Sequence, residues 1–270
     1  MSPICRLVIS ALLCLGACEG ALAETVKTVF LEELTWTEVR DELRAGKTTV
    51  IVPVGGTEQS GPHIALGKHN VRVKVLAGRV ATGLGNALVA PVIAYVPEGS
   101  VAPPAGHMRF AGTISVPMAA FETTLEYAAR SFRQHGFRDI VLIGDHGGYQ
   151  TSLAKVAARL NREWAASPVR VHAVEEYYRA GDRDYAQALK LKGFGAEEIG
   201  THAGLADTSL SLAVDPHLVR IERLHDGTKL GAAEGVYGDP RRASAELGQA
   251  GVDLIVGMTL AAIRNDVARR

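Results

Sequence analysis

The chain has 270 residues, and its 29 basic and 29 acidic side chains give a formal net charge of zero. This balance argues against nucleic acid or an anionic membrane surface as the partner, because proteins that bind these polyanions usually carry an excess of lysine and arginine. The length suits one large α/β domain with its own core.

The first 23 residues are typical of a secretory signal peptide. Arg6 precedes an apolar run over Leu7–Leu15, and Ala21-Leu22-Ala23 forms a small-residue cleavage pattern. The run is too short to span a bilayer. A rival pattern, Leu15-Gly16-Ala17-Cys18, resembles a bacterial lipobox with Cys18 as the lipidated residue. We therefore expect an exported protein, periplasmic or secreted, either soluble or anchored through Cys18, without a transmembrane span in the mature chain.

All three cysteines lie in this segment, at Cys5, Cys14 and Cys18. A mature chain that begins after Ala23 therefore has neither a disulfide nor a thiolate metal site. We expect residues 24–270 to form a single domain.

Apolar runs and amphipathic stretches alternate along this domain. The alternation predicts an α/β fold, in which a mostly parallel sheet is covered by helices on both faces. The predicted strands are Thr49–Val54, Ala87–Tyr95, Ile140–Ile143 and Val169–Val174, and the predicted helices are Thr37–Ala45, Val71–Leu84, Met118–His135, Thr151–Ala165 and Ala243–Val267.

Two of the loops that follow predicted strands carry side chains suited to a metal ion. Glu58 and His69 lie in the Gly- and Pro-rich loop after Val54, and His146 follows the strand that ends near Ile143. Ligands bind at the carboxyl ends of strands in open α/β sheets. A catalytic zinc commonly has three protein ligands of N and O type and one open position for water. Glu58, His69 and His146 are therefore the predicted metal ligands, with zinc first and manganese or iron also suited.

Other loops supply candidates for catalysis and substrate binding. His202 is a candidate general acid or oxyanion donor, and Asp207 either orients it, binds metal or only caps the following helix. His107 and Arg109 lie in a long segment, residues 97–113, that we expect to form a lid or pocket wall. Gly147 and Gly148 let the backbone approach a substrate, and they lie at the start of the next predicted helix.

Four of these segments, in chain order, resemble the creatininase family. They are Gly55–His69, His107-Met108-Arg109-Phe110-Ala111-Gly112-Thr113, Gly144-Asp145-His146-Gly147-Gly148-Tyr149 and His202–Ser209. The resemblance implies a three-layer α/β/α sandwich, a metal-dependent hydrolase of C–N bonds in cyclic or linear amides, and a homo-oligomer that in this family is commonly a hexamer.

The same resemblance shows where this chain departs from the family pattern. Glu58 and His146 match metal ligands, whereas Ser60 stands at a ligand His and His69 at an Asp that bridges two metals. These changes predict one metal ion per chain. The alternative is a non-catalytic exported solute-binding or scaffold protein on the same fold.

Overall fold

Four parallel strands form the central sheet, in the order β2-β1-β3-β4. The computed structural model describes residues 27–269, so the predicted signal peptide and the lipobox at Cys18 lie outside the described residues. The strands are β1 (Thr49–Val54), β2 (Ala87–Val89), β3 (Asp139–Gly144) and β4 (Arg170–Ala173).

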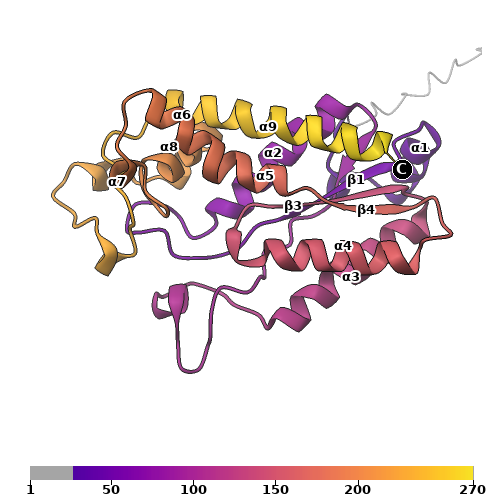
Figure 1. The fold of residues 1–270 in the computed structure, drawn as a ribbon, viewed down its shortest axis with the longest axis horizontal. Helices are drawn as coiled ribbons and strands as arrows, with labels where there is room; N and C mark the ends of the chain where they lie inside the picture. Colours follow the sequence, from indigo (N-terminus) through magenta and orange to yellow (C-terminus); the bar gives the residue numbers. More distant parts are fainter. Residues whose placement is uncertain (1–26, 270) are drawn as a thin grey trace, which may run out of the picture.

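Helices cover both faces of this sheet (Figure 1). Successive side chains of a strand point to opposite faces, so β1 places Ile51 in one core and Val50, Val52 and Val54 in the other. The core around Ile51 also receives α2 (Lys68–Leu84), α5 (Glu175–Arg179), α6 (Tyr185–Leu191), α7 (Ala196–Ile199), α8 (Leu205–Val214) and α9 (Ala245–Ala268). The opposite core receives α1 (Trp36–Arg44), α3 (Met118–His135) and α4 (Gln150–Glu163). The predicted three-layer α/β/α sandwich is confirmed.

The register of β1 and β3 brings their following loops together. Val54 pairs with Gly144 at the carboxyl end of both strands, so the chain leaves the sheet from neighbouring points at one edge. By contrast, β2 ends at Val89 and not near the predicted Tyr95. Pro91 has no backbone N–H to continue the ladder, and only an isolated bridge from Ile93 to Val54 follows.

The observed starts of α2 and α8 determine where two candidate site residues lie. α2 begins at Lys68, after Gly67 at its N-cap, and not at Val71. His69 therefore lies in the first turn of a helix and not in a loop. α8 begins at Leu205, which places Asp207 in its first turn. Both starts matter, because they fix the direction in which these side chains enter the site.

In the described part of the chain, one helix is long and apolar enough to cross a membrane by length and composition. This is α9, of which 33% of the most apolar window is buried. α9 packs against α2, α5 and α8, and the core helix of a soluble protein has the same composition. The absence of a transmembrane span in the mature chain therefore stays a prediction.

Candidate metal centre and active site

Glu58 reaches the centre of the site from the loop that follows β1. Its side chain is fully buried, and Oε1 accepts a 2.7 Å hydrogen bond from Nε2 of His69. Burial raises the pKa of Glu58, but the hydrogen bond from His69 and the charge of Lys68 together hold it well below its usual value. The residues that the structure describes give the second oxygen, Oε2, no hydrogen-bond partner. Glu58 is thus an ionised carboxylate with one oxygen free for a cation.

Two imidazoles lie beside that free oxygen. Nε2 of His107 is 3.3 Å from Oε2 of Glu58, and Nε2 of His146 is 3.5 Å from it. One donor atom from each of the three residues lies within 4.8 Å of the other two. Bonds of about 2.0–2.1 Å to a tetrahedral zinc would place neighbouring ligand atoms about 3.4 Å apart. Glu58, His107 and His146 therefore have the spacing and the chemistry of a metal-ligand set.

His146 has the neutral charge that a metal ligand requires. Burial, followed by the positive charge of His69, lowers its pKa to about 4. The backbone N–H of Gly148, a predicted substrate-binding residue, donates to Nδ1 at 3.2 Å, which places the proton of the neutral ring on Nε2. Metal binding through Nε2 therefore requires that this proton leave Nε2.

His69 occupies a different place from the one that the sequence pattern predicts. Its Nδ1 lies 2.5 Å from Oδ1 of Asp145 while Nε2 binds Glu58, so both ring nitrogens contact carboxylates. Burial and the charge of Lys68 lower the pKa of His69, but the bonds to Asp145 and Glu58 outweigh them and raise it. A protonated ring with both nitrogens engaged has no lone pair for a metal. The geometry thus favours His107 over His69 as the third ligand, with His69 orienting Glu58.

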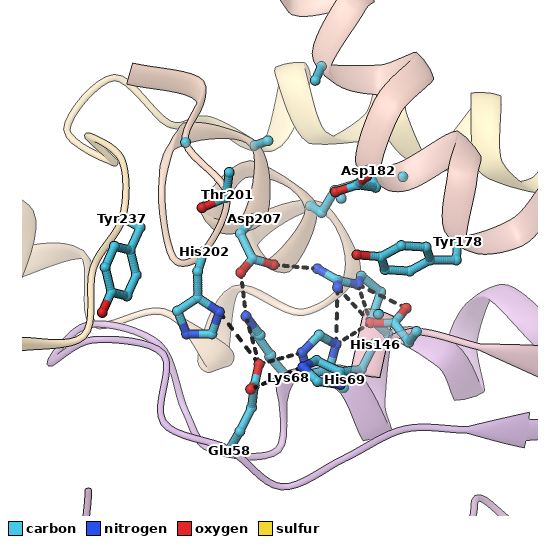
Figure 2. Close-up of a pocket in the computed structure, with 18 of the residues that line it drawn as sticks. Glu58, Lys68, His69, His146, Tyr178, Asp182, Thr201, His202, Asp207 and Tyr237 are labelled. Carbon is cyan, nitrogen blue, oxygen red and sulfur yellow. Dashed lines mark hydrogen bonds and ion pairs between the residues drawn. The ribbon is translucent and has the colours of Figure 1, made fainter. Parts of the chain in front are cut away.

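A buried network of charges supports this arrangement from α2 (Figure 2). Lys68 pairs with Asp207, and its Nζ lies 3.6 Å from Oε1 of Glu58. Arg72, one helical turn further, donates to Asp145 at 2.8 and 3.0 Å and to Asp207 at 2.8 Å. Neither cation is among the candidates predicted from the sequence, because the predicted helix begins at Val71, after Lys68, and no motif draws attention to Arg72.

Asp207, the other candidate in the loop of His202, lies between these two cations. Burial raises its pKa, but Lys68 and Arg72 hold it well below the usual value. One of its oxygens also accepts from the backbone N–H of Ala203 at 3.0 Å. Asp207 is the third residue of α8 and does not cap that helix, whose N-cap is Gly204; it neutralises the two cations and holds the backbone of Ala203.

His202, the candidate general acid or oxyanion donor, lies beside Glu58. Its Nε2 donates to the backbone carbonyl of Gln59 at 2.9 Å, and its Nδ1 lies 3.6 Å from Oε1 of Glu58. Burial and the charge of Lys68 lower its pKa to about 4. The neutral ring, with its proton fixed on Nε2, therefore presents the Nδ1 lone pair to the site.

A cavity of about 430 Å³ opens beside these groups. Its walls include Gly147, Tyr178, Thr201 and Tyr237, together with Glu58 and the imidazoles already described. Of the predicted substrate-binding residues, His107 and Gly147 line this cavity. Arg109 does not: its side chain is exposed, and its Nε contacts the carbonyl of Gly106 within its own turn. A hollow of about 450 Å³ on another side is lined by Glu98, His107, His146 and Gly148.

The sequence matches the family described as "Creatininase: Creatinine amidohydrolase" over residues 32–263. It is 32% identical over 205 residues to the creatinine amidohydrolase of Pseudomonas putida, and the aligned region covers 74% of this chain and 77% of that protein. It is 29% identical over 234 residues to the mycofactocin precursor peptide peptidase of Mycolicibacterium smegmatis, with 79% and 83% covered.

Comparison of the fold with solved structures also indicates similarity to creatininases. A solved creatininase superposes with a TM-score of 0.73 at 28% sequence identity, over 89% of this chain and 98% of that one. Other solved creatininases are described as a Zn–Zn type, a Mn form and a complex with creatine. Because the family match spans most of the chain and the relatives align over most of theirs, this chain belongs to the creatininase family of hydrolases.

Proposed function

We propose that this protein is a metal-dependent amidohydrolase that cleaves a C–N bond in a small cyclic or linear amide. The observation that carries the proposal is the convergence of Oε2 of Glu58 and Nε2 of His107 and His146 at ligand spacing beside a cavity. The names of two relatives, a creatinine amidohydrolase and a peptide peptidase, support hydrolysis at carbon–nitrogen bonds.

The donor set suits one divalent ion per chain, with zinc as the first choice and manganese or iron as alternatives. The Zn–Zn and Mn forms of solved relatives support zinc and manganese as the candidate metals. A second ion beside Glu58 would compete with the ammonium of Lys68, which already lies between Glu58 and Asp207. When bound, the ion supplies Lewis acidity, which polarises an amide carbonyl and makes water more acidic.

The residues around the ion transfer protons, orient Glu58 and bind the substrate. His202 accepts a proton at Nδ1 and returns it to the leaving nitrogen, since its Nε2–H is fixed on the carbonyl of Gln59. Lys68 and His69 keep Glu58 ionised and correctly oriented. The cavity walls, which include Tyr178 and Tyr237, bind and orient the amide in a partly polar environment.

A substrate screen with the metal-loaded protein tests this proposal. The panel contains cyclic ureas, lactams, N-formyl compounds and short peptides, so that peptide and non-peptide amides are separated. We expect turnover that disappears in Glu58→Gln and persists in Glu122→Gln, a matched loss of a buried carboxylate on α3 that pairs with Lys155. Metal bound without turnover of any member would instead support the non-catalytic solute-binding alternative.

We also propose that the protein is exported and forms a homo-oligomer, up to a hexamer. The N-terminal pattern around Arg6 and Ala23 supports export, and family membership supports assembly. Intact mass of the protein from a periplasmic fraction distinguishes cleavage after Ala23 from lipidation at Cys18, and full-length protein in the cytoplasm would contradict both. Light scattering on the purified protein gives the oligomeric state, and a monomer would contradict the proposed assembly.

A further inference from the structure

Glu98 is a buried carboxylate outside the set of Glu58, His107 and His146. It lies in the segment between β2 and the turn that carries His107, and its side chain is fully buried. Within residues 27–269, no hydrogen-bond donor reaches either of its oxygens. A buried carboxylate without a partner is costly, so such a group normally has a cation or a proton to neutralise it.

The backbone holds Glu98 firmly in this position. Its N–H donates to Oγ of Ser115 at 3.0 Å, and that hydroxyl donates to the carbonyl of Gly99 at 2.8 Å. Gly56, with a φ of +154°, makes room for the carboxylate, because a Cβ there would come within 2.6 Å of Oε1 of Glu98. The placement is therefore built by three separate parts of the chain.

The free oxygens of Glu98 face the candidate metal centre. Oε2 lies 3.6 Å from Nε2 of His146, which in turn lies 3.5 Å from the free oxygen of Glu58. These separations exceed hydrogen-bonding distance, but they are close to the spacing of about 3.4 Å between ligand atoms around one tetrahedral zinc.

We propose that Glu98 is a further ligand of the same divalent ion, so that two carboxylates, Glu58 and Glu98, and two imidazoles, His107 and His146, hold it, with a coordination position beyond these four left for the water or amide of the proposed function. The inference rests on the metal site of the proposed function. Two carboxylates balance the double charge of the ion, whereas Glu58 alone leaves one positive charge uncompensated by its ligands. The second carboxylate that the family pattern has at position 69 is thus supplied from another loop. Added oxygen character also increases the relative affinity for manganese over zinc.

Metal binding to purified, chelator-treated protein tests the inference without any substrate. Zinc affinity is measured by competition with a chromophoric chelator, and the visible spectrum of the Co²⁺-loaded protein reports the ligand set. The variants are Glu98→Gln and Glu98→Ala, with Glu122→Gln as the control for loss of a buried carboxylate. Melting temperatures of the metal-free proteins show that each variant is folded.

We expect Glu98→Ala to weaken zinc binding by more than about 100-fold, which exceeds the effect of losing an outer hydrogen-bond partner, and to change the Co²⁺ spectrum. Glu98→Gln should weaken binding in the same direction. Neither should lower the melting temperature of the metal-free protein, because each removes an unpaired buried carboxylate. Affinities within about threefold of wild type would overturn the assignment. Failure of the wild-type protein to bind metal would instead overturn the proposed function.

Discussion

Replacement of His69 by alanine separates two explanations of the metal centre. In the structure, His69 donates to Oε1 of Glu58, while the oxygen that faces the ion site is Oε2. The variant therefore leaves every proposed ligand in place and removes one orienting hydrogen bond. Loss of such an outer partner typically costs about 10–100-fold in metal affinity, or roughly 1.4–2.7 kcal/mol. In this variant Asp145 keeps hydrogen-bond donors, because Arg72 and Tyr177 still donate to it.

The assay is zinc affinity by chelator competition, together with the Co²⁺ spectrum of the loaded protein. His172→Ala is the matched control, since His172 is another buried imidazole, paired with Asp139 at 3.0 Å on the sheet. We expect the control to bind zinc as the wild type does, and His69→Ala to bind it more weakly with an unchanged number of nitrogen ligands. Complete loss of binding, or loss of a nitrogen ligand from the spectrum, would refute this reasoning and restore His69 as a ligand.

Three further predictions concern the groups around the site and the stability of the fold. Arg72→Met should lower the free energy of unfolding by about 3–5 kcal/mol, because it leaves buried carboxylates uncompensated. Urea denaturation measures this loss, with Arg79→Met, at an exposed position of the same helix, as the control. Equal losses in the two variants would contradict the prediction. A hydrogen bond from Lys155 lowers the pKa of Glu122 below its usual value of 4.5, so its contribution, about 1 kcal/mol or less, should be present above pH 4.5 and disappear as the pH falls. Unfolding free energies of wild type and Glu122→Gln that differ equally at pH 7 and pH 3 would show the opposite. His202→Asn should lower kcat by about 10²–10⁴-fold with metal content unchanged, and an unaffected kcat would exclude His202 from proton transfer.

The layers of the fold could be predicted because the apolar runs are strong and regular. β1 and α3 have the predicted bounds, since both are long periodic segments with clear stops. The start of α2 could not be predicted, because Gly67 caps it without a side-chain hydrogen bond and its first turn is polar. The buried pairs that make Lys68 and His69 acceptable there come from distant parts of the chain.

The sequence indicates those candidate residues of the site that lie in loops directly after predicted strands. Glu58 and His146 follow directly on paired strands, so sheet topology alone brings them together. The sequence assigned His107 to substrate binding, and only the folded path of residues 97–113 places it beside Glu58. Glu98 carries no periodic signal, and its meaning depends on the absence of a donor around it in the described structure. Such information is tertiary and is not available from local patterns.

The most direct test of the account is a crystal structure of the zinc-loaded protein with the metal located by anomalous scattering. We expect one ion per chain, bound by Glu58, His107 and His146 and, by the further inference, Glu98, with His69 in the adjacent hydrogen-bonded position. An ion bound through His69, two ions per chain, or an ion outside this cavity would contradict the account.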